Sequence, residues 1–126
     1  MNATDLYQFA QLVRRQQVAS LRAADKEAGF ETPQERIDCF CCVKLSPGRS
    51  WWTLSVASLP KLMIHNKTGE IFGVCPPYTI DRRRPYGTIE TVDKWYWGEF
   101  RPRPVSDVAG MPDVAGTENG VKPCQS

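Results

Sequence analysis

The side chains with the most reactive chemistry in this sequence are its thiols and its single imidazole. The 126 residues include five cysteines and one histidine. A zinc site could draw four ligands from this set: Cys39, Cys41, Cys42, Cys75 and His65. The spacing fits zinc poorly, because no C-x-x-C pair repeats and adjacent residues on a strand point to opposite faces. Core packing of free thiols is the favoured interpretation, since unpaired cysteine is among the most buried residue types.

A catalytic thiol–imidazole pair is the second chemical alternative. Cys75 and His65 flank a predicted hairpin, but nothing marks a third group that would orient the imidazole. No phosphate-binding glycine loop, dinucleotide fingerprint, zinc-protease pattern or serine-hydrolase pattern occurs. We therefore expect no enzymatic activity, no cofactor and no bound metal.

Residue types that serve recognition are concentrated between Arg82 and Pro104, in RRRPYGTIETVDKWYWGEFRPRP. Trp, Tyr and Arg dominate binding hot spots and the platforms on which single-stranded nucleic acids stack. A partner-binding surface is therefore predicted from these residues: Arg82, Arg83, Arg84, Tyr86, Trp95, Trp97, Arg101 and Arg103.

Adjacent aromatic residues make part of this segment difficult to bury. Residues 89–97 are predicted to form a short helix, on which consecutive residues are about 100° apart. Trp95, Tyr96 and Trp97 cannot all face inward, so at least one should remain partly exposed. The same reasoning applies to Trp51 and Trp52, because neighbouring residues on a predicted strand point to opposite faces. The structural alternative is that most of these rings fill the gap between helix and sheet, with the arginines along the surface.

The elements that must position these residues begin with a long helix. Asn2 or Thr4 can cap it, Asp5 suits its first turn, and Gly29 suits its end. Positions with helical spacing form one stripe: Leu6, Phe9, Ala10, Val13, Gln17, Leu21, Ala24 and Ala28. The surface against which the stripe packs comes from the rest of the chain or from a second copy, so a homodimer through this helix is one alternative.

Strand patterns follow. Residues 51–57 alternate in polarity, and residues 61–65 and 70–74 flank Asn66–Gly69, which suits a type I turn that ends in a left-handed glycine. Residues 33–45 are ambiguous; we favour a brief helical turn, opened by a capping box at Thr32–Glu35, that passes into a strand near Ile37–Leu45. The run Arg82–Arg84 suits a solvated loop.

These elements predict one α+β domain over residues 1–104: a long N-terminal helix, an antiparallel meander of three or four strands and a short C-terminal helix. Residues 105–126 are small and polar, which favours a flexible tail. The sequence shows no secretory signal and no apolar run of membrane-spanning length, so we expect a cytoplasmic protein with reduced cysteines and no membrane partner.

Charge limits the classes of partner. The formal net charge is +2, with 24% charged residues. This balance is far from the strongly basic footprint of a dedicated DNA-binding domain, and it also argues against acidic mimicry of nucleic acid. A basic middle between acidic ends is a mild indication of an anionic partner.

The segments NKTGEIFGV and PYGTIETVDKWYWGEFRP, both within residues 66–103, resemble small uncharacterised proteins carried on bacterial plasmids and phages. The resemblance brings no catalytic residue with it. It implies a mobile-element setting, in which small single-domain proteins often bind and block host machinery, anti-CRISPR and other anti-defence proteins among them.

The leading hypothesis is a non-enzymatic binding protein that contacts a host or cellular protein complex through its Arg/Trp-rich surface, with inhibition implied by the resemblance. The alternative is a nucleic-acid-binding protein in which the arginines contact phosphates and Trp97 or Trp51 stacks on bases. A zinc-stabilised module is the third interpretation.

Overall fold

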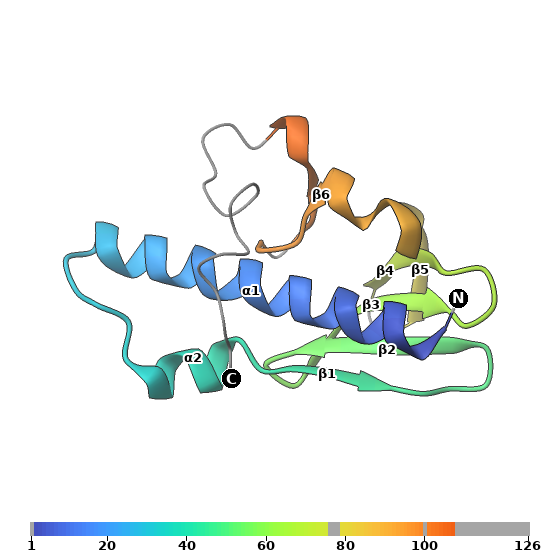
Figure 1. The fold of residues 1–126 in the computed structure, drawn as a ribbon, viewed down its shortest axis with the longest axis horizontal. Coiled ribbons are helices and arrows are strands. Elements are labelled where there is room, and N and C mark those ends of the chain that lie inside the picture. The colour runs from blue at the N-terminus through green and yellow to red at the C-terminus, as the bar shows by residue number, and fades with distance from the viewer. Residues whose placement is uncertain (1, 76–78, 100, 108–126) are drawn as a thin grey trace.

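A long helix packed on a five-stranded antiparallel sheet forms the frame of the molecule (Figure 1). The structure is a computed structural model that describes residues 2–75, 79–99 and 101–107. Its elements are, in chain order, α1 (Ala3–Glu27), α2 (Gln34–Phe40), β1 (Val43–Ser46), β2 (Trp51–Val56), β3 (Leu59–His65), β4 (Glu70–Cys75), β5 (Thr79–Thr88), the 3₁₀ segment η1 (Ile89–Lys94), β6 (Trp95–Tyr96), β7 (Arg103–Pro104) and the 3₁₀ turn η2 (Val105–Asp107).

The five strands β1 to β5 lie side by side in chain order, and β6 and β7 form a separate small pair. The α+β class and the long N-terminal helix are therefore confirmed. The predicted turn between β3 and β4 is also present, with Gly69 at a φ of 76° in the left-handed region that glycine tolerates.

Both ends of α1 follow the signals in the sequence. The side chain of Asn2 accepts a hydrogen bond of 2.9 Å from the backbone N–H of Asp5, which caps the first turn. After the last turn, Gly29 has a φ of 98°. Glycine reaches this conformation without the steric cost of a Cβ, so the helix ends there.

The apolar stripe of α1 is buried only along its first half. Leu6, Phe9 and Val13 join the core between α1 and the sheet. The second half of α1 runs past the sheet (Figure 1), and the stripe positions Ala24 and Ala28 are exposed. The chain itself therefore covers only the first half of the stripe, and a homodimer through this helix stays a prediction.

A buried carboxylate connects α1 to α2. Asp25 is 2% exposed and accepts two hydrogen bonds from Arg36, at 2.8 and 3.0 Å, and one from the hydroxyl of Thr32 at 2.8 Å. The predicted capping box is wrong, because Pro33 is the N-cap residue of α2 and Thr32 is used by Asp25 instead. The predicted order of a short helix followed by a strand is confirmed, but the predicted strand near Ile37–Leu45 begins too early, because α2 continues to Phe40 and β1 starts at Val43.

The fifth strand corrects the sequence-based prediction of three or four strands with a solvated loop at Arg82–Arg84. Residues 79–88 form β5 at one edge of the sheet. Charged residues and proline are depleted in central strands, which is why the pattern RRRP favoured a loop. An edge strand tolerates both, because one side of its backbone needs no partner strand.

The predicted helix over residues 89–97 is wrong in its second half. Thr88 and Thr91 form a reciprocal capping box at the start of η1, but Thr91 departs from helical geometry, with a φ of −116°. The turn then ends, and Trp95 begins an extended segment. An irregular turn of this kind cannot propagate the hydrogen bonds of an α-helix, so Trp95 and Tyr96 lie on extended backbone.

Two of the three adjacent aromatic residues are fully buried. Tyr96 and Trp97 are both 0% exposed, whereas Trp95 is half-buried, so the expectation that one of the three stays partly exposed is confirmed for Trp95. The Trp97 ring meets Phe9 edge-on at a centroid distance of 4.8 Å. The backbone N–H of Trp97 donates to the side-chain oxygen of Gln16 at 2.8 Å.

Close approach of this segment to α1 depends on Gly98. A Cβ at this position would lie 2.5 Å from the backbone oxygen of Gln16, well inside normal contact distance. The backbone oxygen of Trp97 accepts a hydrogen bond of 2.8 Å from the side chain of Gln17. Hydrogen bonds therefore hold the C-terminal segment against the middle of α1, and the lack of a side chain at Gly98 permits this close approach.

The predicted tail, residues 105–126, lies outside the described residues from position 108 onward; residues 105–107 form η2. Within the described ranges, no helix combines the length and the apolar character needed to cross a membrane.

We predict that Trp97→Ala destabilises the protein by about 3–5 kcal/mol, the usual cost of removing a fully buried large aromatic ring. Trp95→Ala should cost clearly less, because Trp95 is already half-exposed. Urea unfolding followed by far-ultraviolet circular dichroism measures both free energies of unfolding. Equal losses for the two variants would contradict the burial difference.

Candidate binding site on strand β5

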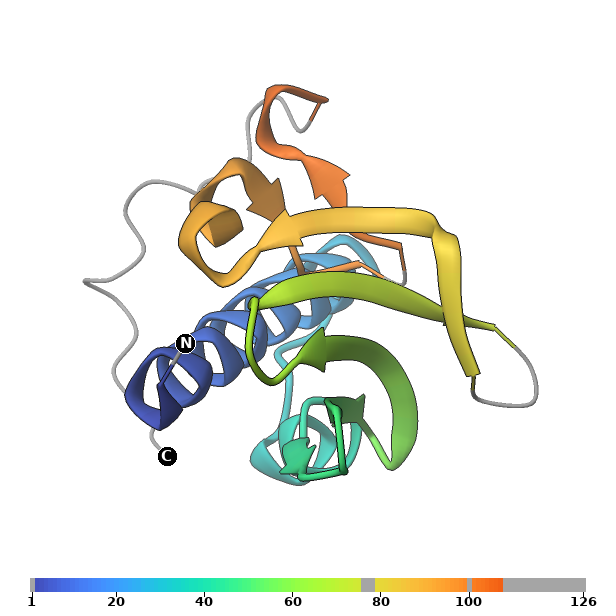
Figure 2. The ribbon, with the colours of Figure 1, turned by 90° about the vertical axis from the view of Figure 1, so that its right-hand side faces the viewer.

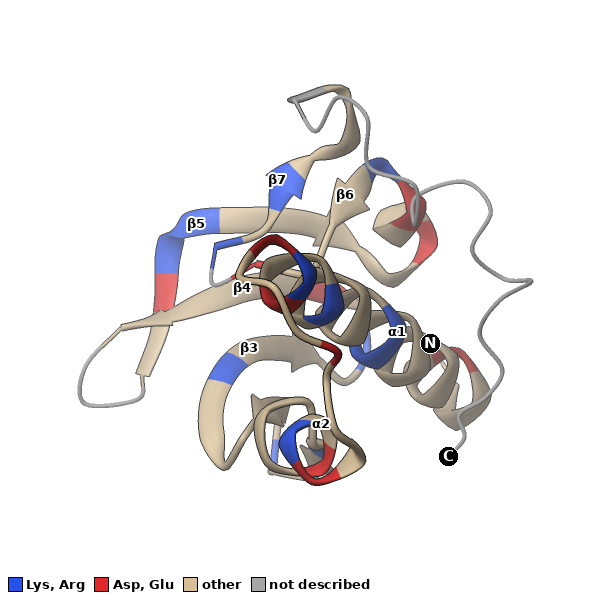
Figure 3. Ribbon diagram, turned by 90° about the vertical axis from the view of Figure 1, so that its left-hand side faces the viewer, with Lys and Arg blue, Asp and Glu red and all other residues tan. Residues whose placement is uncertain are grey.

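The predicted arginine cluster lies on a bulge in β5. Gly73 of β4 pairs with Asp81, but the neighbouring Phe72 pairs with Pro85, so residues 82–84 have no opposing partner. A bulge of extra residues bends a strand and changes the direction of its side chains. β5 bends sharply along its length (Figure 2), and basic and acidic residues mark this bend (Figure 3).

Asp81 holds the bulge. Its carboxylate is 6% exposed and accepts three hydrogen bonds: from the backbone N–H of Arg83 at 3.0 Å, from Arg83 Nε at 3.2 Å and from Arg84 Nε at 2.9 Å. The backbone hydrogen bond from Arg83 is the largest cause that holds the pKa of Asp81 below its ordinary value, although burial opposes it. The carboxylate therefore stays ionised and fixes two guanidinium groups.

Arg82 extends over aromatic side chains of the sheet. Its guanidinium carbon lies 5.7 Å from the ring centroid of Trp51 and 5.8 Å from that of Phe72. The ring of His65 meets Trp51 edge-on at 4.8 Å. These four residues, Arg82, Trp51, Phe72 and His65, are called the aromatic patch below. Its three rings are each partly exposed.

The aromatic patch belongs to the sheet face opposite α1. Along β2 and β3, the core residues Leu54, Leu62 and Ile64 occupy alternate positions that point toward α1. Trp51 and His65 occupy the intervening positions and pair directly across the two strands. Because successive side chains of a strand point to opposite faces, the patch lies on the other side of the sheet.

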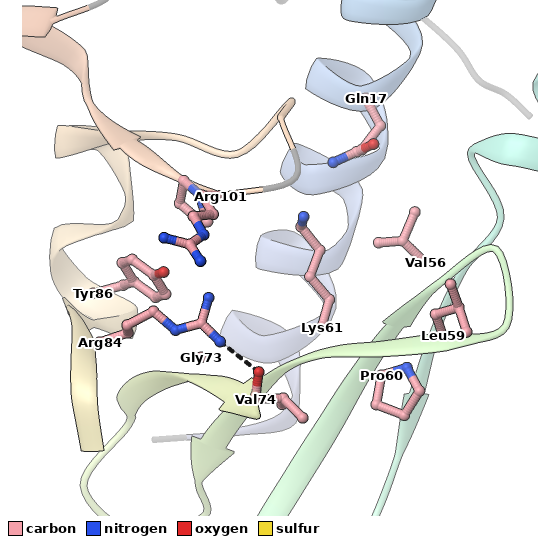
Figure 4. Close-up of a pocket in the computed structure, with 11 residues that line it drawn as sticks. Gln17, Val56, Leu59, Pro60, Lys61, Gly73, Val74, Arg84, Tyr86 and Arg101 are labelled. Carbon is pink, nitrogen blue, oxygen red and sulfur yellow. Dashed lines mark hydrogen bonds between the residues drawn. The ribbon is translucent and has the colours of Figure 1, made fainter. Parts of the chain in front are cut away.

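Arg84 leaves the bulge in another direction, and Arg83 stays at the surface. The Arg83 side chain is 86% exposed. Arg84 lies across Gly73 and donates from its terminal nitrogen to the backbone oxygen of Val74, at the edge of a pocket (Figure 4). Arg101 reaches the same pocket.

The predicted surface is thus divided rather than continuous. Arg82 and Arg83 lie at the sheet face and its edge, Arg84 and Arg101 line the pocket, and Arg103 pairs with Glu99 at 2.8 Å. Lys61 lies beside Arg84 and Arg101 in the pocket. This position could not be predicted from local spacing, because Lys61 stands alone in a predicted strand.

Two predicted surface residues are in the interior. Trp97 is 0% exposed and Tyr86 is 6% exposed, so the expectation that Trp97 anchors a partner is wrong. Their rings are 6.0 Å apart in an edge-on contact. The physical reason is that the segment after η1 returns to α1 and places Trp97 against Phe9 instead of on a helix surface. Trp95 remains half-buried beside Tyr86, at 5.2 Å.

The thiols and the imidazole do not converge. Among the described residues, no three His, Cys, Asp or Glu side chains are grouped so that they could hold a metal ion. Cys41 is buried as predicted, but Cys39 and Cys42 are exposed. His65 lies at the β3–β4 turn, where its Nδ1 accepts hydrogen bonds of 3.2 Å from two turn N–H groups. Cys75 lies at the opposite end of β4.

Comparisons of the chain with models of protein families, with curated proteins and with solved structures returned no match. The assignment of a site therefore depends on the geometry of the molecule.

We predict that Asp81→Asn lowers the stability at pH 7, because the neutral amide loses the charge-assisted contacts to two arginines. Because the pKa of Asp81 is lower in the folded state than its ordinary 3.8, its contribution is complete above that value and is lost as the pH falls through the lowered pKa. Urea unfolding at pH 7, 5 and 3 should show that the difference in the free energy of unfolding between wild type and variant narrows below about pH 4.

Asp93→Asn is the matched control, because Asp93 is exposed on η1. If the free energy of unfolding of Asp81→Asn differs from that of wild type by the same amount at every pH, the charge of this carboxylate does not hold the bulge.

Proposed function

We propose that this chain is a non-enzymatic binding protein that uses the aromatic patch to contact an acidic surface of a protein partner. The observation that supports this most strongly is the placement of Arg82 over Trp51 and Phe72 on a sheet face opposite the main helix. Arg and Trp are the residue types enriched in binding hot spots, and a guanidinium stacked on rings is already positioned for contact.

The charge around the patch favours an acidic partner surface. The Arg83 side chain, at 86% exposure, stands beside the patch at the bulge. Because Arg83 and Arg84 share the single carboxylate of Asp81, the bulge keeps a net positive charge. Opposite charge on the partner would accelerate encounter and fix its orientation, while the aromatic rings would supply the buried area.

The resemblance of residues 66–103 to proteins of plasmids and phages supports a bacterial cytoplasmic setting. In that setting the partner would be a host protein complex, and the outcome of binding would be inhibition of the anti-defence type. The two segments that carry the resemblance include Phe72 of β4 and the part of β5 after the bulge. The resemblance therefore overlaps the proposed surface in part.

A nucleic-acid partner is the second candidate, and the placement of the arginines counts against it. Arg83 and Arg84 share Asp81, and Arg103 pairs with Glu99. A phosphate backbone would need a row of cations along one continuous surface. These arginines are instead divided among the sheet edge, the pocket and the contact with Glu99. The aromatic patch alone provides a stacking surface without such a row.

Arg82→Ala and Trp51→Ala should each weaken partner binding by about tenfold or more, as expected for central hot-spot residues. The partner is first captured from a bacterial lysate on wild-type protein, identified and purified, and the dissociation constants are then measured by calorimetry. Arg22→Ala, at an exposed position of α1, is the control and should bind like wild type. Undiminished affinity of both patch variants would refute the proposal.

Binding to a labelled single-stranded oligonucleotide distinguishes the second candidate. We expect no binding at moderate salt. An affinity that falls steeply with salt and is lost in Trp51→Ala would assign the patch to nucleic acid instead.

A further inference from the structure

A pocket of about 420 Å³ lies between the sheet and the segment that follows β6. This volume falls within the range of roughly 300–1,000 Å³ that is typical of small-molecule sites. Figure 4 shows that its two ends differ in character. Charged and polar side chains gather at one end, and aliphatic side chains at the other.

Three cationic side chains from separate parts of the fold meet at the polar end. They are Lys61 of β3, Arg84 of β5 and Arg101, which follows β6. In Figure 4 the terminal nitrogens of Arg84 and Arg101 point toward each other. The described residues that line the pocket include no Asp or Glu. Like charges repel strongly where water is partly excluded, so this grouping becomes favourable when an anion lies among them.

Arg84 is fixed in place before any ligand arrives. Its Nε donates to Asp81 at 2.9 Å, and one terminal nitrogen donates to the backbone oxygen of Val74. The side chain lies across Gly73, where an added Cβ would be only 3.1 Å from its Nε. Binding would therefore cost little ordering of this side chain, because a guanidinium held in this way is already oriented.

The lowered pKa of Lys61 shows the electrostatic cost of grouping these cations. Its ammonium group is partly buried and donates a hydrogen bond of 2.8 Å to the backbone oxygen of Glu99. Burial, and then the positive charge of Arg84, lower the pKa of Lys61 to about 8. Both effects disfavour the charged amine, and a bound anion would reverse the second of them.

Tyr86 contributes a neutral hydroxyl to the same end. Burial is the main cause that raises the pKa of Tyr86, and the nearby charges of Arg84 and Arg101 oppose it. The hydroxyl therefore remains protonated near neutral pH and can donate to an anion.

The other end of the pocket is aliphatic. Val56, Leu59 and Pro60 line it, and Leu59 is 58% exposed. These residues surround the β2–β3 turn, where Ala57 and Ser58 have φ values of 54° and 71°. Two consecutive left-handed residues are characteristic of the tightest hairpin turn, which holds the aliphatic end close to the cations.

We propose that this pocket binds an amphiphilic anion, with a carboxylate or phosphate head among Lys61, Arg84 and Arg101 and an apolar body against Val56, Leu59 and Pro60. The site shares no residue with the aromatic patch. The inference therefore goes beyond the proposed function and can fail or succeed independently of it.

Calorimetric titration of the full chain with hexanoate, acetate and hexanamide tests the two halves of the pocket. Hexanoate should bind at least about tenfold more tightly than acetate, because only hexanoate reaches the aliphatic end, and hexanamide should not bind measurably. Phenyl phosphate against inorganic phosphate repeats the comparison for a phosphate head.

Lys61→Met and Arg101→Gln should each weaken hexanoate binding by about tenfold or more. Arg101 is exposed, so its variant should fold normally, as circular dichroism can verify. Lys67→Met, at the exposed β3–β4 turn, removes the same charge elsewhere and should bind like wild type. Arg84 is not substituted, because its contacts to Asp81 and Val74 also hold the bulge.

The pH dependence gives a readout that a loss of folding would not mimic. Lys61 carries its charge below about pH 8, so hexanoate affinity should be constant from pH 6 to 7 and should fall as the pH rises above 8. The other groups that face it are two guanidinium groups, Arg84 and Arg101, and the phenol of Tyr86. Arginine side chains do not lose their proton in proteins, and the pKa of Tyr86 is raised. Lys61→Arg should bind without this decrease.

The same chemistry could be presented by a free small acid or by the end of a polypeptide. A short peptide ending in leucine, with a free and with an amidated C-terminus, distinguishes these sources. Tighter binding of the free peptide than of hexanoate assigns the head group to a polypeptide, and weaker binding assigns a free small anion. No binding of any anionic probe, equal binding of hexanamide, or full affinity of both cation variants would overturn the proposal.

Discussion

The contact on which the binding surfaces depend is the one between Asp81 and the two arginines that follow it. A carboxylate at 6% exposure needs hydrogen-bond partners, and the backbone and side chains of residues 83 and 84 supply them. This requirement stabilises a bulge in an edge strand. The bulge in turn sends three consecutive arginines in three directions: over the aromatic patch, into solvent and into the pocket.

The second constraint is the return of the C-terminal segment to α1. Residues about 80 positions apart in sequence meet here, because Gln16 and Gln17 bond the backbone of Trp97 on both sides. These contacts close the core over Phe9 and also bring Arg101 above the pocket. The same segment that completes the hydrophobic core therefore supplies one of the three cations.

The arginines differ in the groups that they contact. Arg36, Arg83 and Arg103 are paired with carboxylates. Arg82 contacts rings instead, and Arg84 divides its contacts between Asp81 and the pocket. A modest net charge of +2 thus conceals a local concentration of positive charge, which a sum over the sequence cannot show.

Local chemistry in the sequence determined α1 with its cap and its glycine end, the β3–β4 hairpin and the α+β class, because helix caps, left-handed glycines and alternation act between near neighbours. The expected partial exposure of one of three adjacent aromatic residues is met by Trp95, although the predicted helix from which it was argued ends before this residue. The fifth strand, the burial of Trp97 and the meeting of Lys61 with Arg84 and Arg101 were decided only by tertiary structure. A strand rich in arginine and proline is tolerated because it lies at the edge of the sheet. Contacts between residues about 80 positions apart determine that the ring of Trp97 is buried. Neither feature is encoded in the spacing of nearby side chains.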